Sequence, residues 1–188
     1  MSRVRRKATP AVASCGIHRR RGLRTVADMT QRIRRLGLPG WLIVVLGLLA
    51  VPRAVLHDLD AVAEGSPVNS LLVFGPLVIW VIVAVLLAGR PFLALLAAGG
   101  VYGIGLAAVH NIFWVRAWAG DPPRLGGNLE GRLSAGQEAV LMRGATTLSS
   151  LFTGLAVGTA CGVIAWATTR LIRRRRSAKE NAAPHPPP

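Results

Sequence analysis

The chain contains 188 residues, of which 52% are hydrophobic and only 16% are charged, and Lys and Arg outnumber Asp and Glu by 23 to 8. A soluble domain of this length carries about 25% charged residues, so long apolar segments are present and a single soluble globule is excluded. The basic residues flank these apolar segments, which explains the net charge of +15 without a nucleic-acid partner, and none is expected.

Residues 1–35 are predicted to form a disordered basic tail in the cytoplasm, because basic clusters occur at 3–7 and 19–24 without apolar periodicity. A chain that began at Met29 would have a shorter tail, which would still contain basic residues before the first apolar segment. Translation from Met29 is therefore an alternative to translation from Met1, and N-terminal peptide mapping distinguishes the two.

Four apolar segments follow the tail and are predicted to be the transmembrane helices of an all-α four-helix bundle covering residues 36–172. Three of them reach the ~20 residues needed to cross a hydrocarbon core about 30 Å thick. The first is interrupted by Arg53, whose side chain must extend toward the headgroups. A signal anchor or cleaved signal peptide is the alternative for this segment, although no clear cleavage site follows it. The predicted spans are 38–57, 70–88, 91–115 and 145–170.

The distribution of charge predicts the orientation of the bundle. With an even number of spans, 18 Lys and Arg residues fall on the side of the two termini and five fall on the other side. Six of the eight acidic residues fall on that second side. The positive-inside rule then predicts a multi-pass protein of the cell membrane with both termini in the cytoplasm.

The loop between the third and fourth spans is predicted to be external. Residues 120–131 are rich in Gly and Pro, which excludes a helix there. Ser134 and Gln137 have the spacing of a helix-capping box, so a helix is predicted to begin near Ala135. This short helix is expected to lie on the membrane surface until Gly144 allows a bend into the fourth span.

Small residues form stripes on the third and fourth spans. Gly154, Gly158 and Gly162 occur at successive i+4 positions, and Gly99 and Gly103 repeat that spacing. Small residues on one face let two helix backbones approach closely in a membrane. We therefore predict that the third and fourth spans pack together through these glycines. The alternative is that one stripe faces a second copy of the chain in a homo-oligomer.

Polar residues collect near the external ends of the predicted spans. Arg53, His57 and Asp60 share one helical face, and His110 lies about 7.5 Å below the outer end of the third span. The alternatives are a polar helix end that simply meets water, and a neutral His110 that hydrogen-bonds between helices. We predict an outward-facing pocket between the first, third and fourth spans. Its candidate residues are Arg53, His57, Asp58, Asp60, His110, Asn111, Asn128 and Ser150.

A metal site is one interpretation of this pocket. His57 and His110, with Asp58 or Asp60 nearby, supply enough ligands for a divalent metal such as zinc or copper. No His-x-x-His or Glu-x-x-His spacing supports the site, and a haem held by the two histidines is less favoured. The sequence therefore leaves the cofactor unknown.

Residues 173–188 are predicted to be a basic and then proline-rich cytoplasmic tail. The basic cluster that opens it can hold anionic lipid headgroups, with about 1 kcal/mol for each charge. The candidate lipid-contacting residues are Arg173, Arg174, Arg175 and Arg176.

Three segments, Pro52–Leu59, Tyr102–Asn111 and Leu125–Gly131, resemble segments of small, uncharacterised four-span integral membrane proteins of bacteria. The resemblance covers about residues 41–169 and implies a four-span architecture. Because such proteins carry no agreed activity, it implies no catalytic residue. The polar residues that it singles out are His57, Asp58, His110 and Asn128.

These features favour a non-enzymatic accessory or regulatory membrane protein that recognises a partner protein or a small ligand from outside. A small oligomeric transporter, or a metal- or haem-binding membrane subunit, is the alternative, but the inner halves of the four segments are almost wholly apolar. An enzyme is not expected, because no paired acid and base, serine nucleophile motif or HExxH motif is visible.

Overall fold

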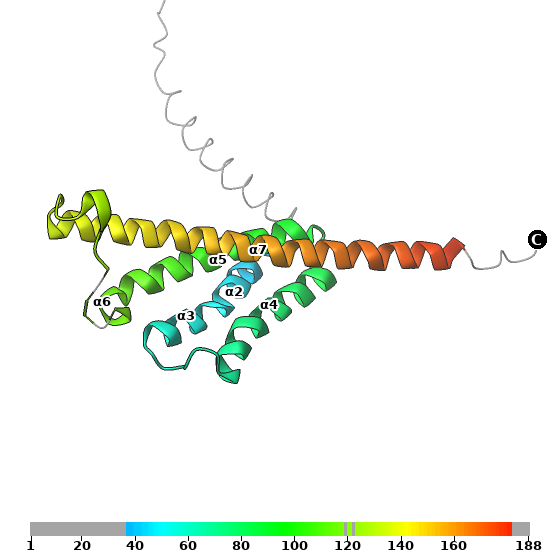
Figure 1. Ribbon diagram of the computed structural model, residues 1–188. Helices are drawn as coiled ribbons and strands as arrows, with labels where there is room; N and C mark the ends of the chain where they lie inside the picture. The colour runs from blue at the N-terminus through cyan, green and yellow to red at the C-terminus, as the bar shows by residue number, and fades with distance from the viewer. Residues whose placement is uncertain (1–36, 119, 122, 182–188) are drawn as a thin grey trace, which may run out of the picture.

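The computed structural model describes residues 37–118, 120–121 and 123–181, and this part of the chain is all-α. The predicted tail at 1–35 and the choice between Met1 and Met29 lie outside the described residues, as does the proline-rich end. Figure 1 shows one long helix with the shorter helices gathered along it. The elements are α2 (Gly40–Leu49), α3 (Val51–Asp58), α4 (Pro67–Leu87), α5 (Pro91–Ile112), α6 (Trp114–Ala117), the 3-10 turn η1 (Gly127–Leu129) and α7 (Ala135–Asn181).

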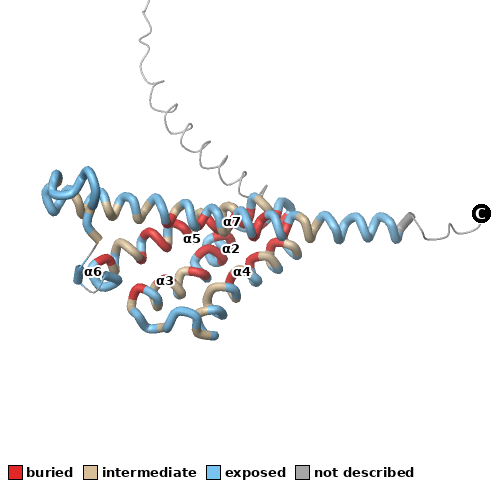
Figure 2. The backbone as a smooth tube through the Cα atoms, viewed as in Figure 1, coloured by how far each residue is buried: buried red, intermediate tan, exposed pale blue. Residues whose placement is uncertain are grey.

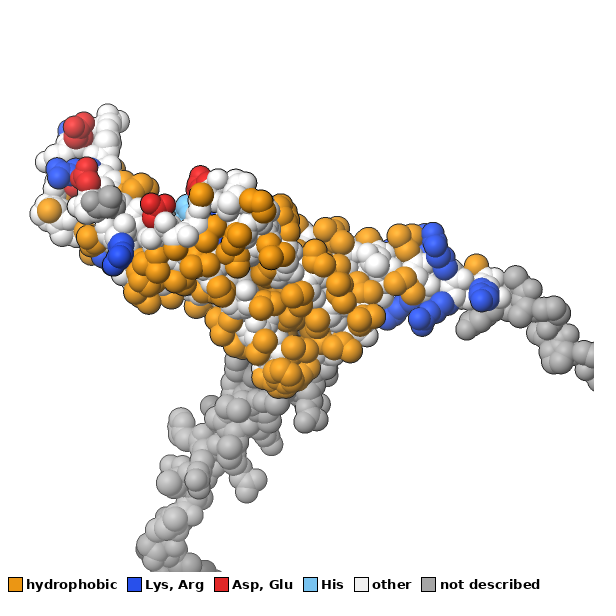
Figure 3. All heavy atoms as spheres, turned by 90° about the horizontal axis from the view of Figure 1, so that it is seen from below, with side chains coloured by type: hydrophobic (Ala, Val, Ile, Leu, Met, Phe, Trp, Pro, Cys, Tyr) orange, Lys and Arg blue, Asp and Glu red, His pale blue; other side chains and the backbone are white. Residues whose placement is uncertain are grey.

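Four helical segments are long and apolar enough to cross a membrane, which confirms the predicted number of long apolar helices. They are α2 together with α3, then α4, α5 and α7. Hydrophobic side chains cover the middle of the molecule, whereas charged side chains gather toward its two ends (Figure 3). An exposed apolar belt between polar ends is the surface that a bilayer requires.

The first candidate span is divided at Ala50, where α2 ends and α3 begins. Pro52 explains the division, because proline has no N–H to continue the helical hydrogen bonds and its ring clashes with the carbonyl four residues earlier. Pro76, by contrast, lies within α4 without ending it. Ser66 caps α4, accepting a hydrogen bond of 3.1 Å from the Asn69 backbone N–H.

The fourth candidate span differs from the prediction, because α7 is a single helix of 47 residues, or about 70 Å at 1.5 Å per residue. The separate surface helix predicted before Gly144 is therefore wrong. Glycine lowers helix stability by only about 1 kcal/mol and does not break the hydrogen-bond pattern. The helix also includes the arginines at 173–176, which were predicted to open the tail. The capping box is present, with the Ser134 backbone N–H donating to Gln137 Oε1 at 3.0 Å.

Helix α5 lies at the centre of the bundle and packs against α2, α3, α4 and α7. Buried residues occur along much of α5 (Figure 2). Its closest partner is α7: a Cβ built on Gly99 would meet the Gly154 carbonyl oxygen and would lie 2.7 Å from the Gly158 Cα. The two glycine stripes therefore face each other within one chain, and neither is left open for a second copy.

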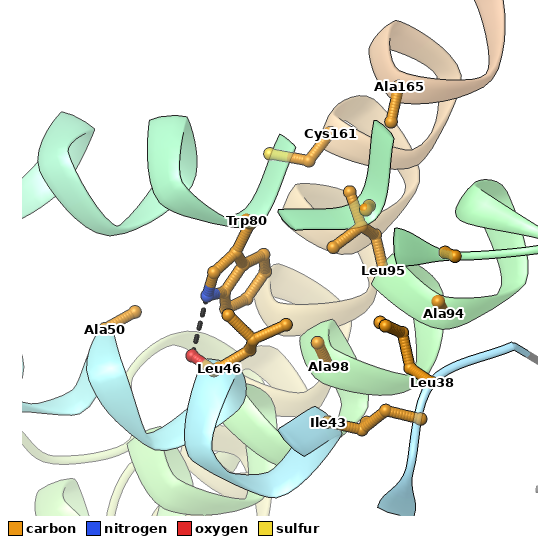
Figure 4. Packing of buried hydrophobic residues seen from close by; sticks show 12 residues of the cluster. Leu38, Ile43, Leu46, Ala50, Trp80, Ala94, Leu95, Ala98, Cys161 and Ala165 are labelled. Atoms are coloured by element: carbon orange, nitrogen blue, oxygen red, sulfur yellow. Dashed lines mark hydrogen bonds between the residues drawn. The ribbon is translucent and has the colours of Figure 1, made fainter. Parts of the chain in front are cut away.

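Trp80 anchors the other side of the core. Its ring is completely buried, and its Nε1–H donates a hydrogen bond of 2.6 Å to the Leu46 carbonyl, which joins α4 to α2 (Figure 4). The ring also meets Tyr102 of α5 edge-on, with centroids 6.2 Å apart. A buried indole N–H needs such an acceptor. Three helices are thus held in register around one side chain.

Candidate ligand pocket

One end of the bundle contains a pocket of about 640 Å³ that we call the ligand pocket. It is formed where α3 and α5 end, and α6 and one residue of α7 complete its wall. Helix α5 ends before Phe113, and α6 begins at the buried Trp114. The lining residues are His57, Asp58, Leu59, Asp60, Val62, Glu64, His110, Trp114, Arg116, Ala117, Trp118 and Thr146.

The turn after α3 brings its polar residues to the pocket wall. The Leu59 N–H still bonds to the Val55 carbonyl, but Asp60 has a left-handed backbone with φ of 53°. Aspartate is one of the few residues with a side chain that tolerates this conformation. The Ala61 N–H then closes the turn on the Leu56 carbonyl at 2.9 Å. This turn changes the direction of the chain and leaves Asp60 exposed at the pocket.

Asp58 and His110 form the central contact of the pocket, with Asp58 Oδ2 2.7 Å from His110 Nδ1. The Asp58 side chain is only 3% exposed, whereas that of His110 is 28% exposed. An ionised carboxylate can only accept hydrogen bonds, so Nδ1 is the donor and carries the hydrogen. In a neutral imidazole the lone pair then lies on Nε2. The contact joins α3 to α5 and fixes the orientation of the imidazole.

A second pair lies on the rim. His57 Nδ1 is 3.6 Å from Glu64 Oε1, and their side chains are 41% and 77% exposed. Exposed pairs of this kind contribute between 0 and about 1 kcal/mol. This pair therefore adds little stability, and its main effect is to place an imidazole and a carboxylate at the mouth of the pocket.

Arg53 and Asn111 do not line the ligand pocket, although both were among its candidate residues. The Arg53 Nε–H donates to Asn69 Oδ1 of α4 at 3.3 Å, and Arg53 lines a separate cavity of about 80 Å³ beside Tyr102. The Asn111 amide donates to the Ala107 carbonyl at 2.8 Å and to Thr147 Oγ1 of α7 at 3.0 Å. A step of one residue rotates a helical side chain by about 100°, which separates Asn111 from His110.

Ser150 and Asn128 also lie apart from the pocket. Ser150 is buried and lines a neighbouring cavity of about 370 Å³ between α5 and α7, which His110 and Thr146 also line. Asn128 is exposed in η1 and lines no part of the pocket. Of the candidate residues, the structure thus brings four together around one pocket: His57, Asp58, Asp60 and His110.

Trp114, Trp118, Arg116 and Thr146 line the pocket but were not among the candidates. The two tryptophans are one helical turn apart and their rings lie 6.4 Å from each other. The Arg143 guanidinium of α7 lies 5.4 Å from the centre of the Trp114 ring and holds it against the bundle. The i+4 spacing of two aromatic residues at the end of a span was the signal that could have identified this wall.

The metal interpretation receives limited support from this arrangement. Within residues 37–118, 120–121 and 123–181, no three His, Cys, Asp or Glu side chains are grouped as the ligands of one metal ion. Each pocket histidine faces a carboxylate through Nδ1, and Nε2 is the remaining nitrogen of each. A two-histidine site would have to use those two atoms.

The fold and the pocket together define a class: an all-α protein with four candidate membrane spans and a polar pocket at one end of the bundle. No family model, curated protein or solved structure matches the chain.

Proposed function

We propose that the protein is a multi-pass protein of the cell membrane with both termini in the cytoplasm, and that it acts as a non-enzymatic accessory or regulatory subunit. Its ligand pocket then opens outward and recognises a small polar ligand or a polar segment of a membrane partner. The single observation that carries this proposal is the contact between the buried Asp58 and the partly exposed His110 at the wall of an open pocket.

The separation of charge supports the orientation. The acidic residues between Asp58 and Glu138 all belong to the pocket end or to the loop beside it. The arginines from Arg170 to Arg176 belong to the opposite end, where α7 extends beyond the other helices (Figure 1). An excess of arginine marks the cytoplasmic side of a bundle.

Cysteine labelling tests the orientation. In a background with Cys15→Ser and Cys161→Ala, single cysteines replace the exposed Asn128 and the exposed Ala178. A membrane-impermeant maleimide should label position 128 in intact cells and position 178 only after the cells are opened. The reverse pattern would show that the pocket faces the cytoplasm.

The balance of charge in the pocket indicates the kind of ligand. Asp58 and Glu64 are each paired with a histidine, whereas Asp60 and Arg116 make no ion pair within the part of the chain that the structure describes. The remaining carboxylate and guanidinium therefore favour a small ligand with both a cationic and an anionic group. The two tryptophans supply an apolar wall for its less polar part.

A thermal-shift screen of the full chain in detergent tests this ligand class. Small zwitterions should stabilise the protein, by about 2.7 kcal/mol at a hundred times their Kd, whereas simple amines and simple carboxylates should have smaller effects. Asp60→Asn and Arg116→Gln should abolish the shift. Glu130→Gln and Arg132→Gln remove the same charges from the exposed loop and serve as matched controls. Equal shifts in both pairs of variants would refute the proposed site.

The same geometry bears on the question of catalysis. The sequence shows no paired acid and base, but the fold brings Asp58 and His110 together, and such a pair can orient a general base. The nucleophile is what this pair lacks: His110 makes no hydrogen bond to a hydroxyl or thiol group among the described residues. We therefore favour binding over catalysis. Hydrolysis of an ester substrate that is lost in His110→Ala would contradict this choice.

A small oligomeric transporter, or a metal- or haem-binding membrane subunit, is the second candidate. The observation that favours it is Arg53, which carries a charge deeper into the bundle than the ligand pocket and lies beside Tyr102. Bound metal and the visible spectrum of the purified protein test this candidate. Stoichiometric metal or a haem band that is lost in His57→Ala or His110→Ala would favour it over the accessory function.

A further inference from the structure

The end of the bundle opposite the ligand pocket has a second pocket, of about 490 Å³, between the α4–α5 turn and α7. We call it the arginine pocket, because Arg90 of the turn and Arg170 and Arg173 of α7 all line it. Arg173 also lines a neighbouring pocket of about 370 Å³, together with Arg176 and the last turn of α4. Two adjoining hollows thus share one row of arginines along α7.

The arginine pocket has no carboxylate to balance these charges. No Asp or Glu lines either hollow within the described part of the chain. The N-terminus of α5 also lies there, and its unpaired N–H groups add a partial positive charge. Three guanidinium groups around one opening repel each other unless an anion lies between them. The charge pattern therefore favours an anionic ligand.

The Arg170 side chain is held in a conformation that suits such a ligand. Its guanidinium lies 5.3 Å from the centre of the Trp166 ring, one helical turn away on α7. Stacking of this kind restricts the side chain and leaves the edge of the guanidinium to donate hydrogen bonds. A phosphate oxygen is a matched acceptor for that edge.

The walls of the arginine pocket distinguish a lipid from a free ion. Phe92, Leu93 and Trp166 line it, and the Leu93 and Trp166 side chains are 40% and 47% exposed. These side chains continue into the apolar belt of the bundle, which acyl chains would cover in a membrane. A free phosphate would gain nothing from them, whereas a phospholipid would place its headgroup among the arginines and its chains along this wall.

We propose that the arginine pocket binds the phosphate headgroup of an anionic phospholipid through Arg90, Arg170 and Arg173. This proposal uses neither the ligand pocket nor the orientation of the protein. It also revises the predicted lipid contacts, because Arg174 and Arg175 line neither hollow, while Arg173 and Arg176 do.

Native mass spectrometry of the full chain in detergent, with added phosphatidylglycerol or phosphatidylcholine, tests the proposal. The wild-type protein should retain phosphatidylglycerol preferentially. The triple variant Arg90→Gln, Arg170→Gln and Arg173→Gln should lose affinity by about fivefold for each charge, or about a hundredfold in all. The matched control Arg174→Gln, Arg175→Gln and Lys179→Gln removes three charges from exposed positions outside both hollows. It should bind as the wild type does.

Equal losses in the two triple variants would overturn the proposal, because net charge rather than the pocket would then determine binding. Trp166→Ala removes both part of the apolar wall and the ring that stacks on Arg170 without changing the charge, and it should weaken phosphatidylglycerol binding while the circular dichroism spectrum stays unchanged. Inorganic phosphate should compete poorly. Displacement of the lipid by phosphate at equal concentration would show that the site recognises a free anion instead.

Discussion

The contact between α5 and α7 makes a quantitative prediction about single methyl groups. Gly99 and Gly154 lie where the two backbones cross, and a Cβ on Gly154 would lie 2.5 Å from both the Cα and the nitrogen of Gly103. Carbon atoms in contact stay about 3.5–4.0 Å apart, so the helices would have to separate by about 1 Å. Because the neighbouring atoms belong to a backbone, no side chain can rotate to relieve the overlap.

Gly99→Ala and Gly154→Ala should therefore lower the free energy of unfolding by about 1–3 kcal/mol, the usual cost of overpacking a core. Gly144→Ala is the matched control, because it lies in the same helix as Gly154 with no atom within 4 Å of the added Cβ. It should raise stability by about 0.5–1 kcal/mol, since alanine favours the helix. The same substitution should thus have opposite signs at two positions of α7.

The severity should also follow the distances along the stripe. A Cβ on Gly162 would lie 3.0 Å from both the side chain and the backbone oxygen of Phe92, which is farther than the 2.5 Å contacts at Gly154, so Gly162→Ala should be a milder change than Gly154→Ala. Unfolding in mixed detergent micelles with increasing dodecyl sulfate, followed by circular dichroism, measures each value. A Gly99→Ala protein as stable as Gly144→Ala would refute the close approach of α5 and α7.

Three further changes test other contacts. His110→Ala should lower the free energy of unfolding by about 1–3 kcal/mol, because it leaves the buried Asp58 carboxylate without its partner. His57→Ala should change this free energy by less than about 1 kcal/mol, because its ion pair is exposed. Chemical unfolding compares the two variants, and equal losses would contradict the difference in burial. Trp80→Phe should cost about 1 kcal/mol or more through loss of the hydrogen bond to Leu46, while Trp41→Phe, at a side chain 67% exposed, should have no effect on the same curve. Ser134→Ala should speed amide hydrogen exchange at the start of α7, because it removes the hydroxyl that accepts a hydrogen bond from the Gln137 backbone N–H. The global stability should not fall, because this cap lies far from the core. Unchanged exchange at the start of α7 would contradict the cap.

The four long helices could be predicted because their signals are local. Uninterrupted apolar length identifies a span, and Pro67 and Pro91 begin α4 and α5 at positions where the missing N–H costs nothing. The single helix α7 could not be predicted from the same signals. Gly144 lowers local helix stability, but it does so too weakly to end a helix whose remaining residues favour it.

The site was harder to predict than the fold. His110 and Asp58 were both candidates, yet nothing in the sequence paired them across 52 positions. Their contact depends on how far α3 and α5 are rotated and shifted along each other, which the side chains of the whole interface determine. The same reason explains why Arg53 turns toward Asn69 of α4, although it shares a helical face with His57.

Helix α5 connects the two pockets and makes them separable by experiment. It carries His110 near one end and begins beside Arg90 at the other, and its 22 residues span about 33 Å. The glycine contact with α7 lies between these ends. Because both pockets are built on the same packed pair of helices, Gly99→Ala should weaken zwitterion binding and lipid binding together. His110→Ala and Arg170→Gln should each affect only the nearer pocket, since neither residue belongs to the glycine contact between α5 and α7. If Gly99→Ala lowered stability but left both binding affinities unchanged, the two pockets would have to be formed locally by their turns and not by the register of α5 on α7.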